Sequence, residues 1–152
     1  EEGNIETVKP AAQVGMVIAL HACNTATDDA LYQAIVWQAE AVFVAPCCQH
    51  EVLHDMKASN IPALLSHGLI RERIAALATD AMRARLLELV GYKVDCIEFV
   101  DLEHTPKNLL IRAQKNQKVC DQKKFQEYEE LKQLFSAEPK LGKLLAPIFH
   151  KF

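Results

Sequence analysis

The chain is poor in glycine and has no long apolar run, and these two absences exclude several classes of protein. Glycine occupies five of the 152 positions, namely 3, 15, 68, 91 and 142. No two of these glycines lie close enough to build a phosphate-cradling loop, so the sequence contains neither a P-loop nor a GxGxxG motif. No stretch approaches the roughly 20 apolar residues of a membrane span, and no secretory signal opens the sequence. We therefore expect no membrane partner.

A large excess of charge of one sign is also missing. Lys and Arg number 17 against 20 acidic residues, for a net charge of −3, too little positive charge to hold nucleic acid by phosphate contacts alone. Half of the residues are hydrophobic, which excludes intrinsic disorder and suits one compact domain. The five cysteines are an odd number and form no disulfide framework, so we expect a reducing, cytoplasmic location.

Short apolar runs alternate with helical patterns along the first half of the chain. The run GMVIAL at 15–20 predicts a strand buried on both faces, and AVFVA at 41–45 predicts a second. Helical spacing predicts helices at 28–39, with Thr27 as N-cap, and at 71–89, stopped by Gly91. Further strands are expected at 92–100 and 109–113, joined by a turn, and further helices at 121–135 and 141–149.

This order of elements predicts an α/β fold with parallel strands and a closing antiparallel hairpin. Ligands of open α/β sheets bind outside the carboxyl ends of the strands. Two polar segments would lie there, namely His21-Ala22-Cys23-Asn24 and Pro46-Cys47-Cys48-Gln49-His50. Residues 114–124 read as a basic polar linker before the helical tail.

The segment His50-Glu51-Val52-Leu53-His54 fits the HExxH pattern of zinc hydrolases. On a helix the two histidines would bind zinc and Glu51 would act as general base. The motif begins close to the strand-ending Pro46, however, and Asp55 places a charge directly after it. A zinc hydrolase therefore stays an alternative, and we assign no metal site.

Cysteines close both of the predicted parallel strands. Cys47 and Cys48 follow one strand and Cys23 follows the other, so we expect a cysteine cluster at the edge of the sheet. A nucleophilic thiolate needs a lowered pKa, which His50 and the start of the next helix could supply. The other interpretation is that these small apolar side chains only line the site. The cysteine spacings match no zinc-finger pattern.

Four arginines lie within fifteen residues of the long predicted helix, at positions 71, 73, 83 and 85. They could bind an anion such as RNA phosphate. The alternative is that they form the solvated side of an amphipathic helix.

Taken together, several segments resemble a class I S-adenosylmethionine-dependent methyltransferase family. This family includes bacterial proteins classed as RNA methyltransferases and the methyltransferase part of the glutathione S-transferase C-terminal domain-containing protein. The segments lie between about Gly15 and Ala113 and are Ala19–Asp28, Ala45–Glu51, Gly68–Arg73, Leu89–Tyr92, Glu98–Asp101 and His104–Arg112. The two segments that follow the parallel strands carry most of the resemblance.

The resemblance implies a fold class, a division of the chain and a methyl donor. The expected strands would be the fourth to seventh of a Rossmann-like methyltransferase sheet, so residues 1–113 would be the C-terminal part of the domain and 114–152 a linker and helical tail. The half with the glycine-rich donor loop would be missing, which would leave this piece inactive by itself. The donor would be S-adenosylmethionine and the substrate RNA or another macromolecule.

The resemblance also implies roles for individual residues. Asn4, Ile5, His21, Ala22, Cys23 and Asn24 would lie on the donor side, and Pro46, Cys47, Cys48 and His50 would face the methyl acceptor. Asn24 is a departure, since the family is expected to have Asp there. A half-sheet also exposes an unpaired edge, so we expect a homo-oligomer or pairing with the missing N-terminal half. The same edge leaves a non-catalytic interaction module as a further alternative.

Overall fold

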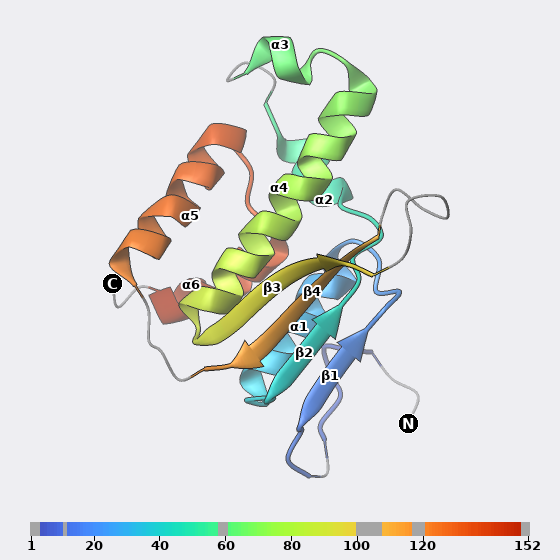
Figure 1. Cartoon of the computed structure of the whole chain (residues 1–152), viewed down its shortest axis with the longest axis vertical. Coiled ribbons are helices and arrows are strands. Elements are labelled where there is room, and N and C mark those ends of the chain that lie inside the picture. The colour runs from blue at the N-terminus through green and yellow to red at the C-terminus, as the bar shows by residue number, and fades with distance from the viewer. Residues whose placement is uncertain (1–3, 11, 58–60, 100–107, 117–120, 150–152) are drawn as a thin grey trace.

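The computed structural model describes residues 4–10, 12–57, 61–99, 108–116 and 121–149 (Figure 1). Strands and helices alternate at first, as the sequence predicts, and are followed by three helices, a pair of strands and two further helices. The elements are β1 (Met16–Ala19), α1 (Thr25–Val36), β2 (Ala41–Val44), α2 (His50–Asp55), α3 (Pro62–Leu65), α4 (Gly68–Leu89), β3 (Tyr92–Glu98), β4 (Leu109–Lys115), α5 (Gln122–Phe135) and α6 (Lys140–Phe149).

The four strands form one mixed sheet in the order β1-β2-β4-β3. β1 and β2 run parallel, with Ile18 opposite Phe43, whereas β4 runs antiparallel to both of its neighbours. β3 therefore points the same way as β1 and β2, and the carboxyl ends of these three strands share one edge of the sheet. The predicted fold class, parallel strands with a closing antiparallel hairpin and a helical tail, is confirmed.

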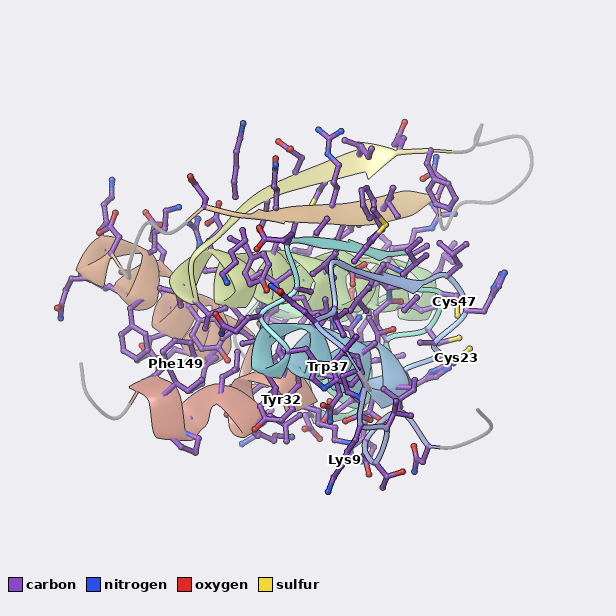
Figure 2. All side chains as sticks on the ribbon, turned by 90° about the horizontal axis from the view of Figure 1, so that it is seen from below. Lys9, Cys23, Tyr32, Trp37, Cys47 and Phe149 are labelled. Carbon is purple, nitrogen blue, oxygen red and sulfur yellow. The ribbon has the colours of Figure 1, made fainter. Side chains whose placement is uncertain are left out.

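The helices cover one face of this sheet, as Figure 2 shows with the sheet seen edge-on. Val42 and Val44 of β2 and Ile111 of β4 point into this side and are fully buried. They join one apolar cluster with Leu31 of α1 and Leu86 of α4. The alternation of buried and half-exposed positions along β2 follows from the two-residue period of a strand.

The opposite face of the sheet is not covered by any described element, and this corrects one prediction. The apolar run of β1 was expected to be buried on both faces, but Met16 is 53% exposed and Ile18 is 60% exposed. Only Val17 and Ala19 pack against the core. An apolar run indicates that both faces of a strand can be buried, but a covering layer must be present to bury them.

Several helix boundaries also differ from the predicted ones, and α1 ends at Val36, three residues before the predicted end at 39. α1 begins at Thr25, so Asn24 takes the N-cap position and Thr27 lies inside the helix, where its hydroxyl donates to the carbonyl of Ala22. α4 begins at Gly68, three residues earlier than expected. Its end is as predicted, because Gly91 has φ 96°, a left-handed conformation that glycine adopts without strain.

The two tail helices belong to the same core as the sheet. Leu141 and Leu145 of α6 are fully buried, as is Tyr128 of α5. The predicted linker at 114–124 is shorter than expected, because Gln114 and Lys115 continue β4 and residues 122–124 open α5. Residues 117–120 and the predicted turn at 101–107 lie outside the described residues.

A membrane-spanning helix must be both long and predominantly apolar. None of the described helices combines the length and the apolar character needed to cross a bilayer.

Candidate functional site

Asn24 ties together the loops that follow β1 and β2. Its backbone N–H donates to the carbonyl of Cys48 (3.2 Å), and its side-chain Oδ1 accepts the backbone N–H groups of His50 (3.1 Å) and Glu51 (3.2 Å). Asn24 thus caps the start of α2 from a neighbouring loop. Its φ of 52° is one that Asn tolerates better than most residues. The role uses only a side-chain oxygen, which the Asp expected from the resemblance would also supply.

A buried ionic network lies directly behind these loops. Arg83 of α4 is 1% exposed, and its guanidinium donates to Asp28 of α1 (3.2 and 2.5 Å), to Asp80 (3.1 Å) and to the carbonyl of Asn24 (3.0 Å). Asp80 also accepts from the Gln49 amide at 3.1 Å. The network therefore links both strand-end loops to the two helices behind them. A bidentate arginine–carboxylate pair makes such a link both strong and directional.

The surroundings of Asp80 in this network shift its protonation equilibrium. Burial raises the pKa of Asp80 to about 6, against the lowering effects of Arg83 and Gln49. Desolvation penalises the charged form of a carboxyl group, and here it outweighs the neighbouring cation. The Gln49 side chain is itself buried, and its amide oxygen has no hydrogen-bond partner in the described part of the protein.

The HExxH segment forms the short helix α2, but its side chains are used for other contacts. The Glu51 carboxylate accepts from the backbone N–H of Lys140 (2.9 Å) at the start of α6 and pairs with Lys143 (2.8 Å). His54 is 89% exposed at its side chain and contacts Asp55. Neither His50 nor His54 belongs to the group of described side chains close enough to share a metal ion. These contacts give the zinc-hydrolase alternative no support.

The predicted cysteine cluster is present at the edge of the sheet. The sulfur atoms of Cys23, Cys47 and Cys48 all lie within 4.8 Å of one another, and Cys23 Sγ is 3.0 Å from Cys47 Sγ. Figure 2 shows the Cys23 and Cys47 side chains next to each other at one end of the molecule. The hydrogen bond with Cys23 and burial raise the pKa of Cys47 to about 12. Cys47 is therefore a protonated thiol at neutral pH.

The remaining predicted site residues fall into two groups. His21 is exposed at the end of β1, Pro46 is buried at the end of β2, and His50 is exposed at the start of α2, so these three belong to the loop regions that carry the clustered cysteines. Asn4 and Ile5 belong to an N-terminal turn that is held against α1 and α6. Their neighbour Glu6 accepts from Gln33 of α1 and pairs with Lys140 of α6.

The structure separates the four arginines of α4 and corrects their interpretation. Arg83 is buried in the ionic network, so it is neither on a solvated face nor free to bind phosphate. Arg71 donates to the carbonyls of Leu53 (3.1 Å) and Met56 (2.8 Å) and thereby holds the end of α2. Arg85 pairs with Glu88 and Glu127. Of the four arginines, only Arg73 fits the solvated-face interpretation.

Sequence reasoning missed the residues that position the loops, namely Asp28, Gln49, Glu51 in this role, Asp80 and Arg83. One signal was available, since Asp80 and Arg83 are three residues apart on a helix and so share a face. The pairing of Arg83 with Asp28, 55 residues away, had no local signal.

The part of the chain that carries β1, α1, β2 and α2 is also the part that is similar to a known family. Residues 1–55 match a family model described as a methyltransferase domain. This matched region contains both strand-end loops, the three clustered cysteines and Asn24. No curated protein and no solved structure matches the chain. The match supports a methyltransferase-type domain for this region and leaves its donor and substrate open.

The described residues provide only one side of a site for a donor such as S-adenosylmethionine. The end of β1 is open to solvent at His21 and Cys23, and the Asn24 side-chain oxygen is already used by two N–H groups of α2. A drug-sized ligand is normally enclosed over most of its surface. These residues by themselves therefore do not fit the whole donor.

Proposed function

We propose that this protein is part of an S-adenosylmethionine-dependent methyltransferase that acts on RNA or another macromolecule. The observation that carries the proposal is the family match at residues 1–55, which coincides with the loops at the carboxyl ends of β1 and β2. In an open α/β sheet this edge is where ligands bind. The same proposal places the end of the methyltransferase part at residue 113. It also includes a cytoplasmic location, which suits the four described cysteines that form no disulfide.

In this proposal the loop after β1 borders the donor and the loop after β2 faces the acceptor. His21, Ala22, Cys23 and Asn24 would border the donor, together with Asn4 and Ile5 from the N-terminal turn. Pro46, Cys47, Cys48 and His50 would line the acceptor side. Methyl transfer from a sulfonium needs little more than an in-line, dry approach of two reactants, so the task of these residues is to orient the acceptor. In the metal-free protein Cys47 lines the site as a thiol, because the hydrogen bond with Cys23 and burial raise its pKa.

The histidines of α2 provide the experiment. His50 lies at the start of α2, beside the Asn24 contact, whereas His54 lies one helical turn farther along and points to solvent. The assay measures transfer of labelled methyl groups from S-adenosylmethionine to RNA by the natural protein that carries this sequence. We expect His50→Ala to reduce the rate of methyl transfer at least tenfold. This is a small part of the rate enhancement that a positioned side chain can supply. His54→Ala is the matched control and should leave transfer near the wild-type rate.

The outcomes of this assay separate the parts of the proposal. If the labelled methyl group appears on protein or on small molecules and not on RNA, RNA is refuted as the substrate, and the methyltransferase activity itself is supported. No transfer to any acceptor would refute the proposed function. An equal loss in both histidine variants, with loss of bound zinc in both, would favour the hydrolase.

A second proposal, an interaction role, rests on the outer edge of the sheet. β1 ends the strand order, and Met16 and Ile18 leave an apolar surface beside it. Unpaired apolar edges recruit further strands. We propose that this edge pairs with a second copy or with another part of the methyltransferase. A monomer by light scattering at high concentration, with no partner bound, would contradict this.

A further inference from the structure

The three cysteines at the strand ends lie together in a way that neither the fold nor the proposed methyl transfer explains. Cys23 comes from the loop after β1, and Cys47 and Cys48 come from the loop after β2. Their sulfur atoms lie within 4.8 Å of one another although 24 residues separate Cys23 from Cys47. No other described group of His, Cys, Asp and Glu side chains is gathered in this way. We propose that Cys23, Cys47 and Cys48 bind a thiophilic divalent cation, zinc, that joins the two loops.

The spacing of the sulfur atoms is close to what such an ion requires. Zinc–sulfur bonds of about 2.3 Å in a tetrahedral arrangement place neighbouring sulfurs about 3.8 Å apart. The Cys23 and Cys47 sulfurs, 3.0 Å apart, are closer together than that value, and no two of the three sulfurs are more than 4.8 Å apart. Small rotations about the side-chain bonds suffice to equalise the distances. A disulfide would instead need two sulfurs at about 2.05 Å.

The backbone around the cysteines is already held in place. The N–H of Asn24, next to Cys23, donates to the carbonyl of Cys48, and the N–H of Ala45 donates to the carbonyl of Ala19 (3.0 Å). Asn24 Oδ1 adds two bonds to the start of α2. The ligands therefore need little ordering when the ion binds, and this lowers the entropic cost of binding.

The chemistry of the group selects the kind of ion. Thiolates favour zinc and other soft cations, whereas magnesium and calcium prefer oxygen ligands. Binding converts three thiols and one divalent cation into a tris-thiolate complex and releases three protons to the buffer. Cys23 is exposed, so the ion has a path from solvent. Three protein ligands leave the fourth tetrahedral position to water or to an incoming ligand, as in zinc sites that are not purely structural.

Cobalt is the probe for this site because tetrahedral Co²⁺ bound by thiolates has intense visible bands and a near-ultraviolet charge-transfer band. The reduced, metal-free chain is titrated with Co²⁺ and then with Zn²⁺. We expect one equivalent of Co²⁺ to produce these bands and Zn²⁺ to remove them. Cys23→Ser, Cys47→Ser and Cys48→Ser should each weaken binding at least tenfold, whereas Cys96→Ser, on β3 and outside the cluster, is the matched control and should bind as the wild type does.

A second measurement on the unchanged chain covers the case in which a serine variant does not fold. Alkylation followed by mass spectrometry should show that Zn²⁺ protects Cys23, Cys47 and Cys48 and leaves Cys96 reactive. Absence of the cobalt bands in the reduced chain, bands that persist in all three cluster variants, or equal protection of Cys96 would each overturn the proposal. These readouts do not involve methyl transfer, so failure of the metal site and failure of the proposed function remain distinguishable.

Discussion

Alternate residues of the same four strands lie in two different environments, one on each face of the sheet. On the covered face, Val44 and Ile111 are fully buried beneath the helices. On the open face, Ile18 of β1 is mostly exposed, and Arg112 of β4 forms an ion pair with Asp95 of β3 at 3.0 Å. β1 and β2 carry apolar residues on both of their faces. The composition of these strands therefore does not explain why one face is buried and the other is exposed.

The comparison shows which face supplies stability and which stays free. Burial of apolar area stabilises the protein by about 25 cal/mol per Å², and this applies only where water is excluded. The covered face and the helices on it should therefore carry most of the free energy of unfolding. The open face should tolerate substitution.

The largest expected effect concerns Arg83, behind the covered face. Arg83→Ala should lower the free energy of unfolding by about 3–5 kcal/mol, because it leaves the buried carboxylates of Asp28 and Asp80 without their cation. Urea denaturation measures the loss. Arg85→Ala is the control, since Arg85 and its partners Glu88 and Glu127 are all partly exposed, and it should cost less than about 1 kcal/mol. If Arg83→Ala lowers the free energy of unfolding no more than Arg85→Ala does, the buried network does not stabilise the fold.

The same substitution on the two faces tests the comparison directly. Ile111→Ala should lower the free energy of unfolding by about 2–5 kcal/mol, since it removes buried methyl groups and leaves a cavity. Ile18→Ala should cost less than about 1 kcal/mol, mainly through the weaker strand propensity of alanine. Both values come from urea denaturation at the same pH. Similar losses at the two positions would mean that the open face is covered in solution.

The pH dependence of stability should reveal Asp80. Its pKa is about 6 in the folded protein and near 3.8 when unfolded, so the folded state holds this proton more tightly. The resulting stabilisation is present below pH 4 and is lost as the pH rises through 6. Relative to Asp80→Asn, the wild type should lose on the order of 2 kcal/mol of unfolding free energy between pH 4 and pH 7. Parallel stability curves for the two proteins would refute the raised pKa.

The smallest expected effect concerns the ion pair on the open face. Arg112→Ala should change the free energy of unfolding by less than about 1 kcal/mol, because the pair with Asp95 is half exposed and screened by solvent. The difference between variant and wild type should shrink further in high salt. Thermal unfolding at low and high salt measures it. A loss comparable to that of Ile111→Ala would contradict the assignment of stability to the covered face.

Local signals were sufficient for the elements and insufficient for the site. The end of α4 before Gly91 and the end of β2 before Pro46 were both predicted from the sequence. Each of these ends depends only on residues that are neighbours in the chain. Thr27 was expected to cap α1, but Asn24 occupies that position. The oxygen of Asn24 serves α2 instead, through a contact between loops 26 residues apart that no local pattern reveals.

By itself, the sequence determined the class of the fold, the order of its elements and the gathering of cysteines where β1 and β2 end. These follow from periodicity and from the rule that parallel strands end at a common edge. Only the tertiary structure decided that the described helices cover one face of the sheet, that Arg83 is buried, and that Glu51 holds the start of α6. Each of these depends on groups far apart in the chain, such as Arg83 and Asp28, whose meeting is set by packing of the helices and not by any spacing in the sequence.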